Sequence, residues 1–301
     1  MKKFFLFFSS LIIISTIYLV FIDSKTFFAS LINTLDIWLM RVFPSLFTFF
    51  VITSLLINFK IINFFSILLY PLKRIMNFET DEAFNIFILS IFNGNPSTII
   101  FINQSLDNNK ITFNDANVLL KCASFISPFF ILSFFEKKLA YILIISHLLS
   151  NLIYCFFLNR NNKTIKNKKE DDYQINIISF LDSIQKEISI MLLIACMMCV
   201  CNILKYTFSS LFNFFTINTY FSRILLSVIE ISTGLNDLIS INLPPLSLII
   251  FASFLTSFGG FCIHLQVASI LNKKLKYKSY FFARIIQGII SIIISIFFFL
   301  I

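Results

Sequence analysis

Charged residues are scarce in this chain of 301 residues: Asp, Glu, Lys and Arg make up 13%, whereas apolar residues make up 58%. An ordinary globular domain carries about 25% charged residues. The composition therefore excludes such a domain and predicts an integral membrane protein. The net charge of +9 does not indicate nucleic-acid binding, because Lys and Arg gather in short polar breaks between apolar segments, where they set membrane orientation.

The sequence also lacks the motifs of common membrane and nucleotide enzymes. It contains no HExxH, no GxSxG and no phosphate-binding loop, which excludes a typical zinc protease, a serine hydrolase and an ATP-driven pump acting alone. Cys196, Cys199 and Cys201 lie in an apolar segment without a nearby acidic or histidine partner, where cysteine behaves as a small hydrophobic residue. We therefore expect no enzymatic activity, no metal site and no cofactor.

Long apolar segments recur along the chain, and several approach the ~20 residues that a helix needs to cross a bilayer. Lipid offers the backbone no hydrogen-bond partners, and runs this long without alternation are typical of helices. The sequence predicts an all-α polytopic membrane protein with about eight to ten transmembrane or re-entrant helices. The expected spans are 4–22, 42–59, 83–106, 139–159, 238–272 and 285–301, with two shorter candidates at 188–204 and 206–222.

Polar segments divide the chain into four parts. Residues 1–29 combine a basic start with an apolar run and no small-residue cleavage pattern, which predicts an uncleaved transmembrane helix. The stretch "NRNNKTIKNKKEDD" is too hydrophilic to pack and predicts a basic cytoplasmic linker at 159–174. It separates two related halves, 30–158 and 175–301. Whether the short apolar run at 61–72 crosses the membrane or re-enters it stays open.

Helix-breaking residues interrupt two apolar segments at matching places. "NGNPS" interrupts the first half and "TSFGG" the second, and Gly94 and Gly259 are 165 positions apart. After each break come another apolar run, a short polar turn and a further helix. Matching interruptions in two halves indicate the binding site of a transporter built from discontinuous helices, and we expect the two halves to be inverted repeats. A simple kink is the alternative for either break alone.

Polar residues at membrane depth add to this hypothesis. Glu230 lies between apolar flanks, so we expect a solute contact or a proton site; an interfacial carboxylate near Asp237 is the alternative. His264 and Gln266 lie on different faces of one helix, so one can face a cavity while the other bonds between helices. Ser127 and Pro128 mark a further helix break. The candidate solute-binding residues are Asn93, Gly94, Asn95, Pro96, Ser97, Glu230, Thr233, Gly234, Gly259, Gly260, His264 and Gln266.

Four segments carry a resemblance to a known family: "FNGNPSTII", "LLKCASFISPFFILS", "IEISTGL" and "SFGGFCIHLQVASIL". Together they resemble the bacterial sporulation integral membrane proteins of the nucleoside-recognition, or Gate, superfamily, which also supplies gate regions of nucleoside carriers and of the ferrous-iron transporter. The resemblance runs from Trp38 to the C-terminus. It implies a sporulation role and a Gate-like fold. It leaves open whether the protein forms a homo-oligomer.

Two functions follow as expectations. The first is a transporter-like protein that binds a small polar solute or moves it across a spore-related membrane together with a coupling ion. The resemblance implies a nucleoside-like solute. The second is a non-transporting scaffold or assembly factor for the spore envelope. Either would be a multi-pass protein of the plasma membrane or of a membrane of the developing spore, with the lipid bilayer as a partner and no nucleic acid.

Overall fold

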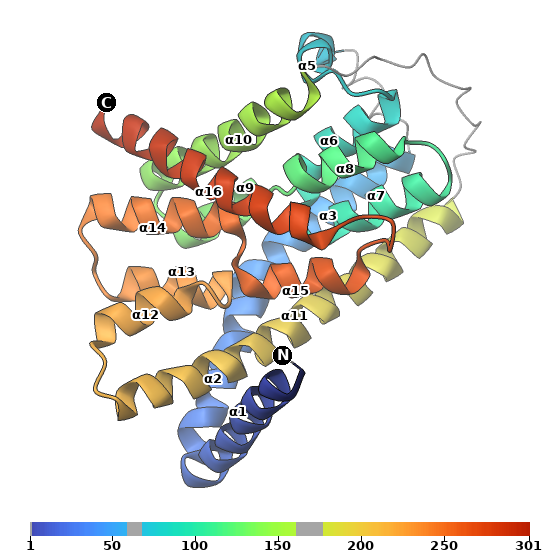
Figure 1. The fold of residues 1–301 in the computed structure, drawn as a ribbon. Coiled ribbons are helices and arrows are strands. Elements are labelled where there is room, and N and C mark those ends of the chain that lie inside the picture. The colour runs from blue at the N-terminus through green and yellow to red at the C-terminus, as the bar shows by residue number, and fades with distance from the viewer. Residues whose placement is uncertain (1, 59–67, 161–176) are drawn as a thin grey trace.

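The computed structural model describes residues 2–58, 68–160 and 177–301. Over these ranges the regular structure is helical, without strands (Figure 1). The predicted all-α fold is therefore confirmed. Five helical stretches of the described chain are long and apolar enough to cross a bilayer, so the protein is a multi-pass membrane protein. They are Ser24–Leu56, Lys137–Asn159, Glu187–Phe214, Pro245–Ile270 and Tyr277–Leu300.

The helices range in length from 5 residues to 38 residues, and the longest exceeds the thickness of a bilayer core. Before residue 160 they are α1 (Lys2–Ile22), α2 (Ser24–Ile37), the π-helical turn η1 (Trp38–Val42), α3 (Phe43–Asn58), α5 (Tyr70–Met76), α6 (Asp81–Asn93), α7 (Ser97–Asp107), α8 (Phe113–Cys122), α9 (Pro128–Phe134) and α10 (Lys137–Asn159). After residue 176 they are α11 (Ile177–Phe214), α12 (Thr219–Ser227), α13 (Ile231–Ser240), α14 (Pro245–Phe258), α15 (Gly260–Ile270) and α16 (Tyr277–Leu300).

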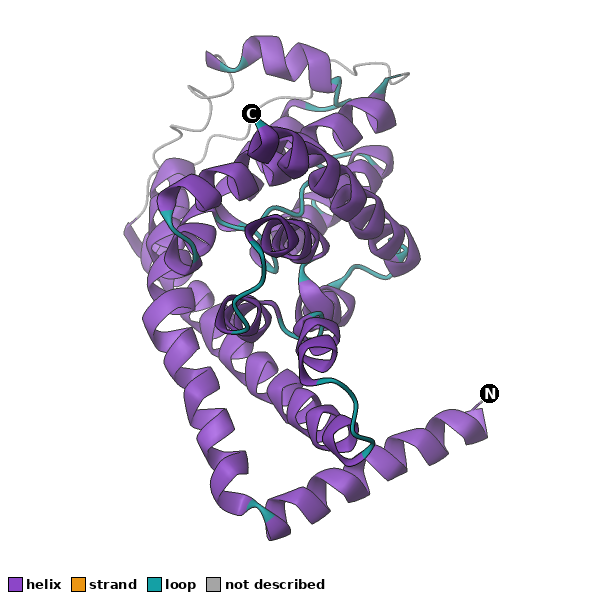
Figure 2. Ribbon diagram, turned by 90° about the vertical axis from the view of Figure 1, so that its left-hand side faces the viewer, coloured by secondary structure: helices purple, strands orange, loops and turns teal. Residues whose placement is uncertain are grey.

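The N-terminal region turns at Asp23, between α1 and α2. Figure 2 shows the N-terminal helix at one end of the molecule. α2, η1 and α3 then follow one another as a single candidate span. The expected linker, 159–174, falls almost wholly outside the described residues, as does most of the 61–72 segment. The linker therefore stays a prediction, and whether 61–72 crosses the membrane stays open.

α11 corrects the expected division of its region. We expected two short spans at 188–204 and 206–222, but the first and most of the second form one continuous helix. Lys205, which separates the two apolar runs, does not interrupt the helix because its charge is paired. Its Nζ lies 2.6 Å from Asp237 Oδ2 and donates to Thr233 Oγ1 at 3.0 Å. This pairing offsets the cost of an isolated ammonium at membrane depth.

Helix ends occur at both predicted interruptions. α6 ends at Asn93 and α7 starts at Ser97, while α14 and α15 meet at Gly259. Gly94 and Gly259 have φ of +65° and +92°, a region that residues with a Cβ rarely adopt. Two further breaks, 123–127 and 228–230, separate α8 from α9 and α12 from α13, so four short non-helical segments lie within the helical body (Figure 2).

The half-helices that follow the two glycine breaks meet at their C-terminal ends. Asn103 Nδ2 donates to the Ile270 carbonyl at 2.7 Å, and Asn272 N donates to Asn103 Oδ1 at 3.1 Å. Asn272 Nδ2 also donates to Asp107 Oδ1 at 2.9 Å. These two residues are separated by 165 positions, the same offset as the two glycines. Residues at matching places in the two halves therefore contact one another directly, and the division into related halves stays a prediction.

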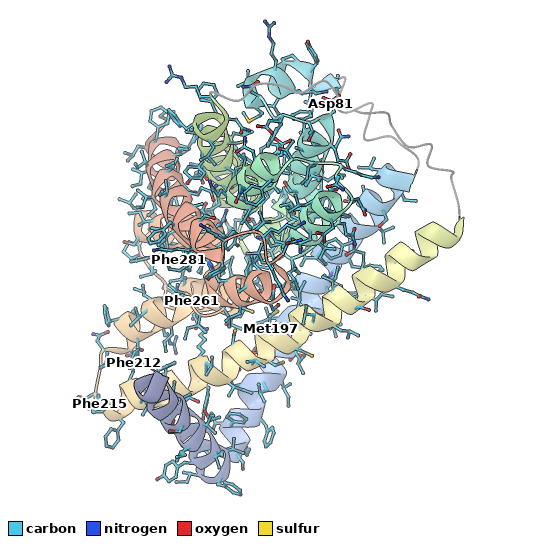
Figure 3. The ribbon with its side chains drawn as sticks, turned by 45° about the vertical axis from the view of Figure 1, so that its right-hand side comes forward. Asp81, Met197, Phe212, Phe215, Phe261 and Phe281 are labelled. Atoms are coloured by element: carbon cyan, nitrogen blue, oxygen red, sulfur yellow. The ribbon has the colours of Figure 1, made fainter. Side chains whose placement is uncertain are left out.

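The outer surface is rich in large apolar side chains, as lipid contact requires. Phe215 beyond the end of α11 is 66% exposed, and Phe261 on α15 is 45% exposed (Figure 3). Apolar residues on the exterior of a water-soluble protein would mark a docking patch or an aggregation hazard. On a protein with five candidate spans they are the surface that the acyl chains cover.

Replacing Gly234 by Ala should destabilise the protein strongly. A Cβ at this position would lie 2.3 Å from the Ser227 carbonyl oxygen, a backbone atom that cannot move aside without shifting α12 against α13. We expect a loss of about 1–3 kcal/mol or more, seen as a lower thermal midpoint in detergent. Gly288→Ala is the control, because its nearest neighbours are ring carbons of Phe254, which can rotate. Equal midpoints for the two variants would contradict this reading of the α12–α13 contact.

Candidate functional site

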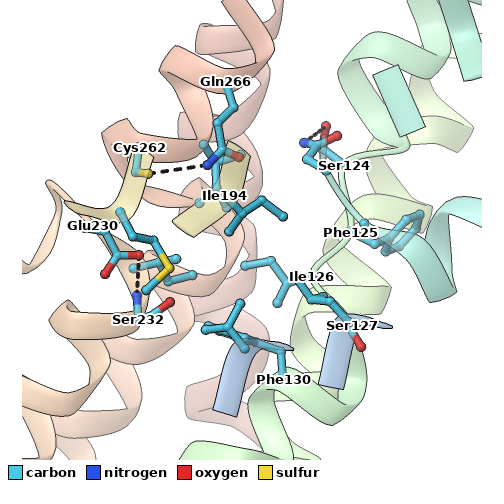
Figure 4. Close-up of a pocket in the computed structure, with 18 of the residues that line it drawn as sticks. Ser124, Phe125, Ile126, Ser127, Phe130, Ile194, Glu230, Ser232, Cys262 and Gln266 are labelled. Atoms are coloured by element: carbon cyan, nitrogen blue, oxygen red, sulfur yellow. Dashed lines mark hydrogen bonds between the residues drawn. The ribbon is translucent and has the colours of Figure 1, made fainter. Parts of the chain in front are cut away.

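Four helix breaks surround one cavity in the middle of the described structure. Its lining includes Gly94 and Asn95 from the first glycine break, the extended segment 124–127, residues 230–232 and Gly259. Side chains of η1, α3, α9, α11, α15 and α16 complete the walls (Figure 4). The cavity holds about 620 Å³, counting the space open to the outside. Segments that are far apart in the sequence thus bring their non-helical backbone to one place.

The first glycine break packs directly against the extended segment. A Cβ on Gly94 would lie 2.8 Å from the Phe125 carbonyl oxygen, so this close approach requires glycine. The neighbouring Asn95 donates from Nδ2 to Ser124 Oγ at 3.0 Å and to the Tyr280 hydroxyl at 3.1 Å. Asn95 therefore connects the break to both the extended segment and α16, while its Oδ1 accepts no hydrogen bond from the described residues.

His147 on α10 holds the extended segment in place. Its Nε2 accepts the backbone N–H of Ile126 at 2.9 Å, which gives a partner to a backbone group that has no helical one. Because Nε2 is the acceptor, the ring proton is on Nδ1, which then donates to Ser257 Oγ at 3.0 Å. His147 is 1% exposed and so bridges α10, the extended segment and α14 inside the protein.

Glu230 caps the start of α13. Its two carboxylate oxygens accept the backbone N–H groups of Ser232 at 2.9 Å and Thr233 at 2.7 Å. This arrangement satisfies two of the orphan donors at a helix start and places a negative charge at the positive end of the helix. Glu230 thus lines the cavity, but both of its oxygens already have a partner in the chain.

The start of α15 is likewise satisfied within the protein. Phe261 and Cys262 donate their backbone N–H groups to the carbonyls of Val228 at 2.8 Å and Ile229 at 2.9 Å. In transporters built from discontinuous helices, the N-termini of half-helices point their positive dipole ends at anionic groups of the substrate. At α13 and α15 the chain itself occupies these N-termini, so side chains carry most of the hydrogen-bonding capacity that remains for a guest.

Arg284 on α16 brings a buried cation to the cavity wall and is 1% exposed. Its Nη1 donates to Gln287 Oε1 at 2.6 Å and to Asn151 Oδ1 at 3.3 Å. Neither partner is charged, and the ion pairs formed by described residues do not include Arg284. A buried cation without a carboxylate partner is costly, so an uncompensated charge faces the cavity.

Three residues of the cavity lining each carry a buried polar atom that has no hydrogen-bond partner among the described residues. The atoms are Asn95 Oδ1, Ser127 Oγ and Arg284 Nε. An unsatisfied buried donor or acceptor costs about 1–3 kcal/mol, so native proteins seldom leave several together without a purpose. One acceptor, one hydroxyl and one cationic donor make the cavity suitable for a small polar molecule.

The cavity brings together only part of the predicted site. Of the candidates, Gly94, Asn95, Glu230, Gly259 and Gln266 line it, together with the predicted break residue Ser127. The remaining candidates lie outside the lining and serve the breaks or the packing around them: Asn93, Pro96, Ser97, Thr233, Gly234, Gly260, His264 and Pro128.

His264 and Gln266 take different roles, as their spacing suggested. Gln266 lines the cavity and donates to Cys262 Sγ at 3.5 Å. The His264 ring instead lies among aromatic rings, with Nδ1 3.0 Å from the Tyr277 hydroxyl and Nε2 3.2 Å from the Phe258 carbonyl oxygen. His264 therefore links α15 to α16, and of the two residues Gln266 is the one that lines the cavity.

Sequence reasoning missed four residues of the site: Ser124, His147, Tyr280 and Arg284. Arg284 immediately precedes an expected span that began at residue 285, which places it at a membrane boundary in the sequence. Its pairing with Gln287 three residues later was the available signal, because two polar residues on one face of an apolar helix seldom face lipid. His147 carries no local signal, since both of its ring partners come from other segments.

Comparison with known proteins gives one informative similarity. The chain is 25% identical over 298 aligned residues to the "Sporulation integral membrane protein YlbJ" of Bacillus subtilis (strain 168), covering 85% of this chain and 73% of that protein. No protein-family model matches the chain. No solved structure matches it either.

Replacing His147 by Ala should destabilise the protein and loosen the cavity wall. The change leaves the Ile126 N–H and the Ser257 hydroxyl without their buried partners, at about 1–3 kcal/mol for each group. We expect a clear drop in the thermal midpoint measured in detergent. Ile145→Ala on the exposed side of the same helix is the matched control and should change the midpoint little. If both variants unfold at the same temperature, His147 does not hold the segment.

Proposed function

We propose that this membrane protein binds a small polar solute in the cavity between its broken helices and moves it across the membrane. The observation that carries the proposal is the group of three unpartnered buried atoms on Asn95, Ser127 and Arg284. A solute that bonds these atoms removes the cost of burying them unsatisfied. Discontinuous helices that meet around such a site are a recurrent arrangement in secondary transporters. The protein is not proposed to act as an enzyme.

The biological setting proposed is sporulation. The similarity to a protein named as a sporulation integral membrane protein supports it, as do the motifs that resemble the Gate-type sporulation proteins. The membrane would then be the plasma membrane of the sporulating cell or a membrane of the developing spore. A Gate-like classification of the fold remains part of the proposal, since it depends on those motifs.

The lining favours a solute that offers both an acceptor and a donor. Arg284 Nε is a cationic donor, for which a carboxylate or phosphate oxygen is the strongest partner. Asn95 Oδ1 needs a donor, which a hydroxyl, an amide or a ring N–H supplies. A nucleoside meets both needs with neutral groups, whereas a small hydroxylated or nitrogen-containing acid meets them with charge. The unpaired guanidinium favours the acid.

A scaffold without transport is the second candidate. It is favoured by the apolar part of the lining, where Phe125, Phe130 and Ile194 contact the cavity, and by the internal cap that Glu230 provides. In such a protein the polar atoms would be bridged by trapped water. The scaffold predicts that no solute stabilises the protein and that Glu230→Gln leaves spore formation intact.

A thermal-shift screen on the purified protein separates the two candidates. The screen uses neutral nucleosides in one set and small carboxylates and phosphates in another. For a solute that raises the midpoint, Arg284→Gln should weaken binding about ten- to a hundredfold, which corresponds to the loss of one charge-assisted hydrogen bond of roughly 1.5–3 kcal/mol.

Arg223→Gln is the matched control, because Arg223 is an exposed residue of α12 whose described side-chain bond is a 3.5 Å contact with Ser240. It should leave the affinity unchanged. A solute whose affinity is insensitive to Arg284→Gln would place the binding site elsewhere. If no compound from either set shifts the midpoint and Glu230→Gln supports normal spore formation, the scaffold is the better account.

A further inference from the structure

Glu187 on α11 is a buried carboxylate that is not part of the cavity lining. The residue is 9% exposed and faces the start of α7, where Ser97 Oγ lies 3.5 Å from its Oε2. At this distance the hydrogen bond is weak. An acid buried against a broken helix in a membrane protein is costly to keep ionised and is a functional candidate by default.

Among the side chains that the structure describes, which do not include the adjacent Lys186, the neighbouring elements supply no countercharge to Glu187. The described ion pairs use Asp81, Asp107 and Asp237 as their acids. α3, which packs along α11, has no ionisable side chain, and the ionisable groups of α15 are Cys262 and His264, bonded to Gln266 and to Tyr277 with Phe258. α7 carries only Asp107, at its other end. The basic residue of α11 nearer the cavity, Lys205, is paired with Asp237.

We propose that Glu187 is a proton-binding site that couples proton binding to the first glycine break. When Glu187 is ionised, its carboxylate accepts the Ser97 hydroxyl and faces the partly positive start of α7. When it takes a proton from water, the new O–H on the carboxyl can donate to Ser97 Oγ, and the local negative charge is gone. The carboxyl then needs no cation beside it.

The coupling route to the cavity is short. Ser97 is the first residue of α7, and Asn95 two residues earlier lines the cavity. In the same break, Asn93 accepts a hydrogen bond from Thr53 on α3, while its buried Nδ2 has no described partner. A change of charge at Glu187 therefore alters the electric field at the first glycine break, where Asn93 and Asn95 carry unsatisfied polar atoms. This coupling rests on the proposed solute site, and by linkage proton and solute would change each other's affinity by the same factor.

The proton site itself is testable without any solute. Infrared difference spectroscopy of the purified protein in detergent, recorded across a pH series, detects the C=O stretch of protonated carboxyl groups. We expect a band that persists at pH values where exposed carboxyls are ionised and that is missing from Glu187→Gln. Glu136→Gln, which removes an exposed carboxyl at the start of α10, should leave the band unchanged.

Ser97→Ala provides a second, conservative variant. Because the Ser97 hydroxyl stabilises the ionised carboxylate, its removal should move the loss of the band to higher pH. An identical band in Glu187→Gln and the parent overturns the proposal, as does a band that appears in the parent only when sodium is withdrawn, which would assign a cation site.

If a solute is found, its Kd should vary with pH in the parent and not in Glu187→Gln. A pH-independent Kd in the parent would overturn the coupling. Absence of any solute in the screen would count against the proposed function, and the infrared band would still decide whether Glu187 binds a proton.

Discussion

A backbone N–H or C=O freed at a helix break inside a bilayer has no water to bond, and the centre of this protein is organised by that constraint. Three of the breaks find their hydrogen-bond partners within the protein. The ring of His147 accepts the Ile126 N–H, the Glu230 carboxylate accepts two N–H groups of α13, and the carbonyls of Val228 and Ile229 accept those of α15. The breaks lie close together because the groups that accept their hydrogen bonds lie close together.

The same constraint decides which atoms are left for a guest. Since the chain satisfies the starts of α13 and α15 itself, the free hydrogen-bonding capacity lies on the side chains of Asn95, Ser127 and Arg284. Half-helix dipoles still contribute to the potential in the cavity, but in the proposed function specificity would come from one amide oxygen, one hydroxyl and one guanidinium. The proposed solute would therefore be selected by the positions of its own hydrogen-bond donor and acceptors.

Several features could be predicted because they depend on local chemistry. A long apolar run forms a helix because lipid offers its backbone no hydrogen-bond partners, and glycine often ends a helix because it readily adopts a positive φ. The interruptions at Gly94 and Gly259 could therefore be predicted from the sequence. The continuity of α11 was not visible, because a lysine in an apolar run normally marks a boundary. Lys205 is tolerated there only through Thr233 and Asp237. These residues follow it by 28 and 32 positions and lie on a different helix.

The sequence by itself determined that this is a helical membrane protein with breaks at a few polar positions, because burial in lipid and helix chemistry act on neighbouring residues. Tertiary structure alone decided that four breaks share one cavity, that Arg284 lines it and that His147 supports its wall. The physical reason is that a hydrogen bond depends on the distance between two groups in space, which can be short for residues far apart in the sequence. Asn151 and Arg284 are separated by 133 positions, and no local pattern encodes their contact.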